Sequence, residues 1–257
     1  MQNPFRLRRR ATPGITSIER VGGDFVVWNL SFSRLERPLV RSPRSLARRI
    51  TGEEVSGLAI DLTDLCMPSV QRTEAIARFV DEIQLRGLSV VLYSVPAAFL
   101  VAVQIEGSYA RFATHTDLAD AVRVLHDYDV MRRECTSDRG RRINQLRMPA
   151  TALSLAPLCL FIGDRLEAGG LEREPRVALL RESYAALLEI LETAYSPGEG
   201  DVSASVAVHD GRATVTILDS GKPHENGSEE PGPAVDRKHR FRILDRHNAI
   251  VLEKDLG

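Results

Sequence analysis

Two short stretches of the sequence combine residue types that could support chemistry. In the first, Pro68-Ser-Val-Gln-Arg72, a serine stands directly before a helical pattern, and Thr73 follows the arginine. Hydroxyl groups at the positive end of a helix lie in a field that stabilises the charge of a phosphate group. A serine at this place can also act simply as the cap of the helix. Capping alone is the interpretation that we favour for Ser69.

The second stretch, Asp219-Ser-Gly221, follows a run in which apolar and polar residues alternate. A carboxylate at the end of a strand accepts hydrogen bonds, and a glycine two residues later allows close approach to the backbone. The same tripeptide also forms an ordinary turn held by an Asx-type bond. Upstream, Glu182, Glu189 and Glu192 share one side of a predicted helix, which is typical of a solvated face.

Other catalytic and metal-binding patterns are missing from the sequence. Its six histidines share no spacing and none belongs to an HExxH motif, so we expect no metal site. There is no Walker loop, no GxGxxG and no GxSxG. The three cysteines, Cys66, Cys135 and Cys159, lie far apart and form no CxxC pair. This usage is typical of the reducing cytoplasm.

The composition predicts a cytoplasmic protein that neither enters a membrane nor binds nucleic acid. The formal net charge is −1, and no run approaches the roughly 20 apolar residues of a membrane-spanning helix. The residues after Met1 do not form a secretory signal. Their basic concentration, Arg6, Arg8, Arg9 and Arg10, predicts a solvated tail.

Strand and helix patterns alternate in the first half of the chain, which predicts an α/β sheet flanked by helices. Gly22-Gly-Asp24 turns the chain into a β-branched and aromatic strand, and Ser42-Pro43 begins a helix. The expected strands are 25–31, 58–62, 88–95 and 109–112. The expected helices run from Pro43 to Gly52, from Ser69 to Gly87, from Ala97 to Ile105, and onward from a cap at Thr116.

The order of these elements resembles that of a STAS domain, the fold of anti-sigma-factor antagonists and of sulfate-transporter tails. The resemblance covers about residues 14–127. It depends on three matches, Ile60-Asp-Leu62, Leu85-Arg-Gly-Leu-Ser-Val-Val-Leu92 and Phe112-Ala-Thr-His-Thr-Asp-Leu-Ala-Asp-Ala121.

The same resemblance implies a site. In STAS-type antagonists, a serine in the turn after the first matched strand is phosphorylated by a partner kinase. Here the register places Gln71, which has no hydroxyl, at that position. The resemblance therefore leaves Ser69 and Thr73 as candidate phosphate acceptors, and Pro68, Ser69, Val70, Gln71 and Arg72 as the expected partner-binding surface.

A polar segment without periodicity, Cys135–Arg142, is the best candidate for a linker between two domains. The expected division is a STAS-like domain at 1–130, a linker at 131–145 and a second domain at 146–257. The second domain has an α+β pattern of two helices and an antiparallel sheet. Its expected elements are a strand at 146–148, helices at 151–168 and 176–195, a hairpin turning at Asp210-Gly211, and strands at 241–244 and 249–252.

This second half resembles the GHKL ATPase fold of anti-sigma-factor serine kinases, a two-layer α/β sandwich. The similarity lies in Arg176–Gly221. In that family an Asp-x-Gly motif reads adenine, which the resemblance assigns to Asp219 and Gly221. The position of the catalytic base falls on Ala185, and that of the magnesium-binding asparagine falls on Glu189.

Lys222–Pro233, where the family has a glycine-rich phosphate lid, is acidic and proline-rich. Such a loop carries the wrong charge for cradling phosphate. We therefore expect no catalytic residues and no cofactor beyond weak binding of ATP and magnesium.

Together the two resemblances imply a bacterial-type, non-catalytic regulator that binds a STAS-type or serine-kinase-like protein, or a second copy of itself. Two alternatives are open. One is an active ATP-dependent protein serine kinase that uses Glu182 or Glu189 in altered roles. The other is a purely structural assembly subunit.

Overall fold

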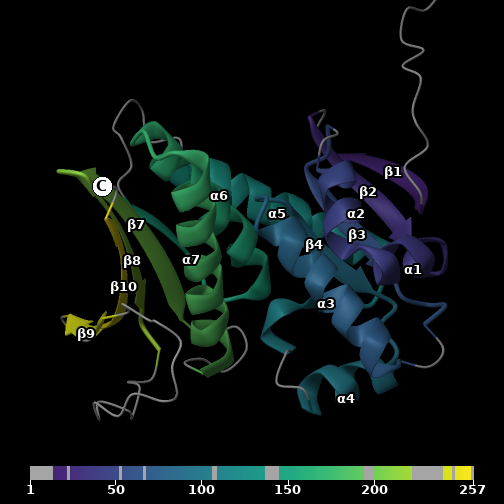
Figure 1. Ribbon diagram of the computed structural model, residues 1–257. Coiled ribbons are helices and arrows are strands. Elements are labelled where there is room, and N and C mark those ends of the chain that lie inside the picture. The colour runs from purple at the N-terminus through teal and green to yellow at the C-terminus, as the bar shows by residue number, and fades with distance from the viewer. Residues whose placement is uncertain are drawn as a thin grey trace, which may run out of the picture.

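The protein consists of two β-sheets, each with its own helices (Figure 1). The computed structural model describes residues 14–21, 24–51, 54–65, 68–105, 109–136, 145–193, 200–221, 240–244 and 247–255. The expected basic tail at Arg6–Arg10 and the loop Lys222–Pro233 lie outside these residues.

The first sheet has five strands in the order β1-β2-β3-β4-β5. β1 and β2 form an antiparallel hairpin, and all other neighbours in this sheet pair in parallel. The strands are β1 (Ile15–Val21), β2 (Phe25–Ser31), β3 (Gly57–Asp61), β4 (Ser89–Tyr93) and β5 (Ala113–His115).

Helices cover both faces of this sheet, as the alternation of strands and helices predicts. α5 (Leu118–Thr136) packs on one face through Ala121 and Leu125, and the other helices pack on the opposite face. They are α1 (Phe32–Arg41), α2 (Pro43–Ile50), α3 (Val70–Gln84) and α4 (Ala97–Ile105).

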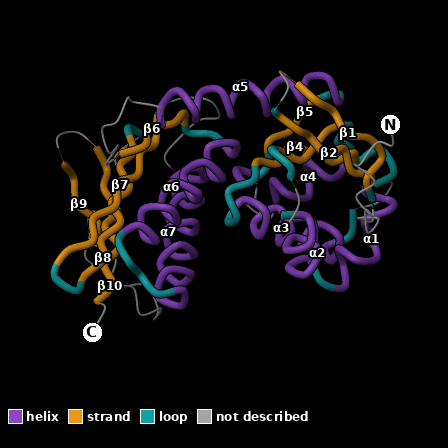
Figure 2. Tube along the Cα trace, turned by 90° about the horizontal axis from the view of Figure 1, so that it is seen from above, coloured by secondary structure: helices purple, strands orange, loops and turns teal. Residues whose placement is uncertain are grey.

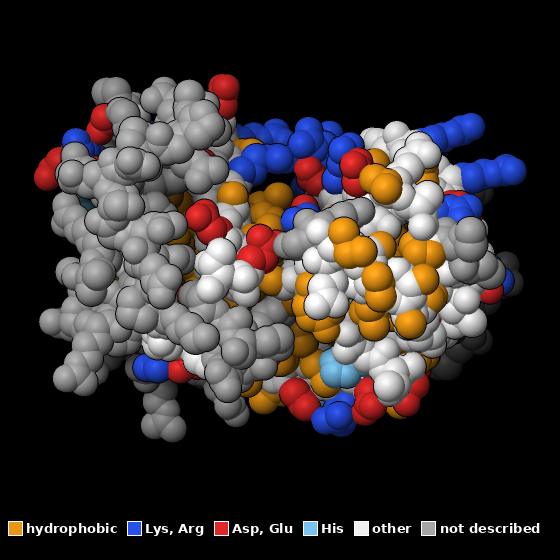
Figure 3. All heavy atoms as spheres, turned by 90° about the horizontal axis from the view of Figure 1, so that it is seen from below, with side chains coloured by type: hydrophobic (Ala, Val, Ile, Leu, Met, Phe, Trp, Pro, Cys, Tyr) orange, Lys and Arg blue, Asp and Glu red, His pale blue; other side chains and the backbone are white. Residues whose placement is uncertain are grey.

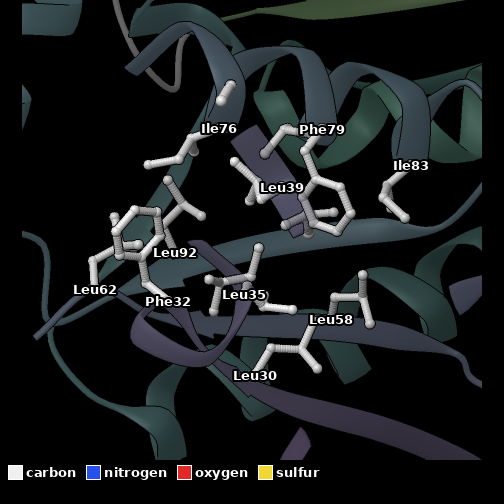
Figure 4. Packing of buried hydrophobic residues seen from close by; sticks show 14 of the residues in the cluster. Leu30, Phe32, Leu35, Leu39, Leu58, Leu62, Ile76, Phe79, Ile83 and Leu92 are labelled. Atoms are coloured by element: carbon white, nitrogen blue, oxygen red, sulfur yellow. The ribbon is translucent and has the colours of Figure 1, made fainter. Parts of the chain in front are cut away.

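The main core of the first half lies between α3 and the sheet. Figure 4 shows Ile76, Phe79 and Ile83 of α3 pointing toward Leu58 and Leu92 of the strands. The spacing of these helical residues places them on one face, so the helix can bury its apolar stripe and leave its polar side outside. The rigid base that results holds the N-terminal end of α3 in place.

The second sheet is entirely antiparallel, in the order β6-β7-β8-β10-β9. The hairpin predicted at Asp210-Gly211 is confirmed, and both residues have positive φ, 51° and 72°, as a tight two-residue turn requires. The strands are β6 (Gln145–Pro149), β7 (Asp201–His209), β8 (Arg212–Asp219), β9 (Arg240–Leu244) and β10 (His247–Asp255).

Two helices form the second layer of this half, α6 (Leu155–Ala168) and α7 (Arg173–Thr193). A short 3-10 turn, η2 (Ala152–Ser154), precedes α6. Both helices pack on the second sheet, and Figure 2 shows them between that sheet and the helices of the first half. The mixed α/β and α+β class expected from the sequence is confirmed.

The two halves touch through helices and not only through the chain that joins them. α3 contacts α6, and α7 contacts a 3-10 turn of the first half, η1 (Tyr109–Arg111). Gly87, just after α3, has φ +78°, and a Cβ built there would lie 2.8 Å from Cβ of Leu160 in α6. Only glycine fits this close approach without displacement.

Three expectations from the sequence need correction. Residues Phe32–Arg41 form α1, a helix that was not predicted because Pro38 stands inside it. The strand expected at 109–112 is η1, and β5 follows it. The helix expected from Thr116 has its capping carboxylate at Asp117, which accepts from the backbone N–H of Asp120 at 2.9 Å.

The first residues of the expected linker, 131–145, are helical. α5 continues to Thr136, with Asp129 paired to Arg132 and Arg133 at 2.7 Å each. Met131 packs against the core of the second half, so this turn of helix belongs to the contact between the halves. Residues 137–144, which include the rest of the polar segment, lie outside the described residues.

Candidate functional site

The turn before α3 carries the first candidate residue, Ser69, and the structure confirms it as the helix cap. Ser69 has extended backbone angles, φ −97° and ψ 154°, and its Oγ accepts a hydrogen bond from the Arg72 N–H at 3.3 Å. This bond satisfies one of the free N–H groups at the start of the helix. The side chain is exposed, so a kinase could still reach its hydroxyl.

Thr73, the second candidate acceptor, has a different environment. Its side chain is fully buried, and its hydroxyl donates to the backbone carbonyl of Ser69 at 3.2 Å. A kinase cannot reach this oxygen while α3 is folded. Phosphorylation of Thr73 stays an untested prediction, and it would require the start of α3 to open, because the helix turns this residue toward the core.

The remaining residues of the predicted surface divide by exposure. Val70 is 67% exposed, and Gln71 beside it is also exposed. Arg72 is half-buried and its Nε donates to Glu36 of α1 at 2.7 Å. Pro68 is half-buried as well. The exposed part of the turn is thus Ser69-Val70-Gln71, held in place by the ion pair behind it.

A second exposed feature is an apolar face of α4, the helix that packs next to α3. α4 contacts α3, contains no charged residue, and buries only Phe99 and Val103. Val101 and Ile105 of α4 are 55% and 81% exposed. Figure 3 shows hydrophobic side chains gathered on this face of the molecule. We call Ser69, Val70, Gln71, Val101 and Ile105 the α3–α4 surface.

The α4 part of this surface was missed at the sequence level. The signal was present, because Ala97–Ile105 is a helix without a charge on any face. A helix that is apolar all round is ordinarily buried. Here the exposed side of α4 has no neighbour among the described residues that buries it.

Polar side chains also line the carboxyl end of the parallel strands. Asp61 of β3 pairs in register with Tyr93 of β4, and its Oδ1 accepts from the N–H and the hydroxyl of Thr63. Tyr93 donates to Oδ1 of the buried Asn29 at 2.8 Å. Burial and the charge of Asp61 raise the pKa of Tyr93, so this phenol is a neutral structural donor.

The residues expected to read a nucleotide lie at the end of β8. Asp219 is buried on the same face of the strand as Ile217, toward the helix layer. Its Oδ1 accepts from the Gly221 N–H at 3.0 Å, which is the ordinary turn bond that the sequence allowed. The structure therefore brings Asp219 and Gly221 together.

Glu189 lies in a different environment from Asp219, on helix α7. It is half-buried on α7, and its charge helps to raise the pKa of Glu192, after burial as the main cause. Glu192 in turn lies 4.0 Å from Arg111 of η1. Glu189 therefore lies one turn from a side chain, Glu192, that reaches the first half of the protein.

That contact contains a buried polar network that the sequence did not reveal. The Tyr184 hydroxyl of α7 lies 2.7 Å from Asp81 Oδ1 and 2.7 Å from Gln84 Oε1, both on α3. Gln84 Nε2 donates to the carbonyls of Arg111 and Ala152, which turns Oε1 toward the tyrosine. The three side chains thus join α3, η1, η2 and α7.

The number of protons available limits the hydrogen bonds that this network can form. A tyrosine hydroxyl has one proton, so it cannot donate to two acceptors at full strength. The Tyr184 hydroxyl therefore shares its proton between Asp81 and Gln84, while Asp81 Oδ2 accepts a second hydrogen bond from Arg111 at 3.0 Å. Burial raises the pKa of Asp81, although the charge of Arg111 works against this. The net direction is upward, so the Asp81 carboxyl takes up a proton more readily than an exposed aspartate does.

Comparison with known proteins gives one solved structure to report. It is a variant of RsbS from Moorella thermoacetica, 24% identical, which covers 45% of this chain and 97% of its own, with a TM-score of 0.37. No family model matches the chain, and no curated protein matches it. The strand order and the helix layers alone define the fold of this chain.

The described residues also bear on membrane insertion and metal binding. None of the helices in the described part of the chain is long and apolar enough to cross a membrane. Within the same residues, no group of three or more histidine, cysteine or carboxylate side chains could hold a metal ion. The buried Cys159 has its pKa raised by burial, which keeps it a thiol rather than a reactive thiolate.

Proposed function

We propose that this chain is a non-catalytic regulatory protein that binds other proteins through the α3–α4 surface, as in partner-switching signalling of the anti-sigma type. The observation that carries the proposal is the exposure of Val70, Val101 and Ile105 on two helices that touch each other. Exposed apolar side chains concentrated on neighbouring helices are typical of protein interaction sites, whereas isolated ones are ordinary.

Ser69 supplies a means of regulation on the same surface. A phosphate on its hydroxyl would add about −2 charge beside Val70 and hinder docking of an apolar partner. The helix cap would survive this change, because a phosphate oxygen can accept the same N–H that Oγ now accepts. Thr73 is not part of this proposal, since it is buried.

The second half is proposed to be a degenerate GHKL-like domain. Its two-helix layer on an antiparallel sheet and the buried Asp219 at the end of β8 support this assignment. Phosphoryl transfer needs a group that orients the nucleophile, and the expected position holds Ala185, whose methyl group cannot do so. We infer weak nucleotide binding at most, in a cytoplasmic protein whose partner is a STAS-type or serine-kinase-like regulator or a second copy of this chain.

Capture of the partner tests the proposal. Purified wild type, Val70→Glu and a matched control, Val130→Glu, would each be immobilised and exposed to extract of the source cells. Val130 lies on α5, away from the surface, and is 38% exposed. A STAS-type or kinase-like protein retained by wild type and control but lost with Val70→Glu supports the proposal. Equal capture by all three proteins contradicts it.

The alternative function, an active ATP-dependent protein serine kinase, is tested with the same wild-type protein. Incubation with magnesium and γ-labelled ATP, alone and with the captured partner, should give no transfer of label. Asp219→Asn should abolish whatever weak ATP binding a thermal shift detects. Magnesium-dependent labelling of the partner would contradict the non-catalytic proposal and make Glu182 and Glu189 the next residues to change.

A further inference from the structure

A local excess of positive charge lies in α1 and α2 and was not recognised from the sequence. Segment 32–50 holds one acidic residue, Glu36, and six arginines, although the whole chain has a net charge of −1. The arginines are Arg34, Arg37, Arg41, Arg44, Arg48 and Arg49. Such a concentration attracts groups of opposite charge.

Part of this charge meets α3 and α7 at one carboxylate. Oε1 of Glu82 accepts from Arg44 Nε at 2.8 Å and from Arg181 of α7 at 3.1 Å. Its Oε2 accepts from Arg86 at 3.2 Å. Helices from both halves of the protein therefore share one buried glutamate.

Arg48 lies four residues after Arg44 on α2, so a fourth guanidinium shares the same side of that helix. Burial lowers the pKa of Arg86, Glu82 opposes this, and the charges of Arg48 and Arg181 lower it further. The charge of Arg48 thus acts on the same guanidinium as the charges of Glu82 and Arg181. We call Arg44, Arg48, Arg86 and Arg181 the arginine cluster.

One glutamate cannot balance the arginine cluster. Four guanidinium charges around a single carboxylate leave a net charge of about +3 at the junction of α2, α3 and α7. Glu82 is ionised here, because the hydrogen bonds from Arg44 and Arg181 lower its pKa against the effect of burial. Figure 3 shows Lys and Arg side chains gathered along its upper edge, over this junction.

We propose that the arginine cluster binds a phosphorylated serine or threonine of a partner protein. A phosphate monoester carries about −2 charge and three acceptor oxygens, which matches several guanidinium forks better than a second carboxylate does. The Arg44 and Arg181 side chains are 54% and 44% exposed, so they can turn donors outward while Glu82 holds their other sides.

A protein segment, and not a nucleic acid, suits the surroundings of the cluster. Val177, one helical turn before Arg181 on α7, is 43% exposed and offers an apolar contact beside the phosphate. A compact group of guanidiniums also differs from the extended stripe that follows a nucleic-acid backbone. This inference rests on the proposed function in that the partner is a protein, but it concerns a second surface.

Calorimetry with defined probes tests the inference. The probes are a short valine-flanked phosphoserine peptide, its serine and glutamate counterparts, inorganic phosphate, a DNA duplex and vesicles containing anionic lipid. The proteins are wild type, Arg48→Ala, Arg181→Ala and the control Arg78→Ala. Arg78 lies on α3 with a 70% exposed side chain and pairs only with Glu74 in the described structure, so it matches the variants in charge.

The expected result is phosphopeptide binding at least about tenfold tighter than that of either counterpeptide. Arg48→Ala and Arg181→Ala should each weaken it by about tenfold, while Arg78→Ala leaves it unchanged. Inorganic phosphate should raise the Tm of wild type and not of the two variants. Equal binding of all three peptides, tighter binding of duplex or vesicles, or no effect of either substitution would overturn the inference.

These outcomes are separable from those for the α3–α4 surface. Val70→Glu should leave phosphopeptide binding unchanged, because Val70 lies at the opposite end of α3 from Glu82. If capture depends on Val70 but no probe binds the arginine cluster, the further inference fails alone. If the cluster binds phosphopeptide but Val70→Glu changes no capture, the α3–α4 proposal fails alone.

Discussion

The hydroxyl of Tyr184 lies 2.7 Å from the Asp81 carboxylate, 103 residues earlier in the chain. This contact joins the two halves across a buried interface, so the halves should unfold together. A Tyr184→Phe variant removes the hydroxyl and leaves Gln84 Oε1 without its donor. We expect a loss of about 1–3 kcal/mol in the free energy of unfolding, measured with urea.

A matched control for this variant is Tyr109→Phe, because the Tyr109 side chain is 42% exposed. It should change the unfolding free energy by less than about 0.5 kcal/mol. Equal stability of Tyr184→Phe and wild type, with two separate unfolding transitions in both, would show that the network does not couple the halves.

The Asp81 carboxyl should make stability depend on pH. Its pKa is raised in the folded protein, mainly by burial, so its contribution is fully present below the ordinary value of 3.8 and is lost as the pH rises through the raised value. The groups that face it are Arg111, which lowers its pKa, and Glu82, which raises it, with Tyr184 donating to it.

Urea unfolding of wild type and Asp81→Asn across a pH series measures this effect. Asp81→Asn should gain stability relative to wild type as the pH rises through this window, since the amide does not ionise. Asp127→Asn, an exposed change on α5, serves as the control. A difference between Asp81→Asn and wild type that does not vary with pH would contradict the raised pKa of Asp81.

Close contact of the halves at Gly87 gives a further prediction. Gly87→Ala forces a side chain into positive φ and toward Leu160, whereas Gly170→Ala forces the same backbone strain with no atom within 4 Å of the new Cβ. Both variants should lose stability, and Gly87→Ala should lose about 1–3 kcal/mol more. Equal losses would mean that α6 does not press on this turn.

The cap at Ser69 can be tested by stability alone. Ser69→Ala should lose about 1 kcal/mol of unfolding free energy, because the Arg72 N–H loses its acceptor, and Ser69→Asp should stay close to wild type. Ser45→Ala, on the exposed face of α2, is the control and should change little. A loss in Ser69→Asp as large as in Ser69→Ala would argue against the cap.

Local rules explain what the sequence could predict. The turn at Asp210-Gly211, the helix starting at Pro43 and the cap at Ser69 each depend on neighbouring residues, and each is observed. Contacts that depend on tertiary structure could not be foreseen in this way. α1 was missed because Pro38 argues against a helix until packing of Leu35 and Leu39 outweighs it.

The candidate site shows the same contrast between local features and features that depend on tertiary structure. Ser69 and Val70 were found because they surround a helix start. The burial of Thr73 depends on which face of α3 meets the sheet, and the bond from Tyr184 to Asp81 depends on how two helices meet. The arginines of α1 and α2 were overlooked because the net charge of the whole chain conceals a local excess.

The most direct test of the central claim is the affinity between this protein and its purified captured partner. The affinity would be measured for wild type, Ile105→Glu and the control Val130→Glu. Ile105 is 81% exposed, so a charge there leaves the core intact while it disturbs the α3–α4 surface. We predict at least about tenfold weaker binding for Ile105→Glu and an unchanged Kd for Val130→Glu. The same Kd for all three proteins would contradict binding through the α3–α4 surface.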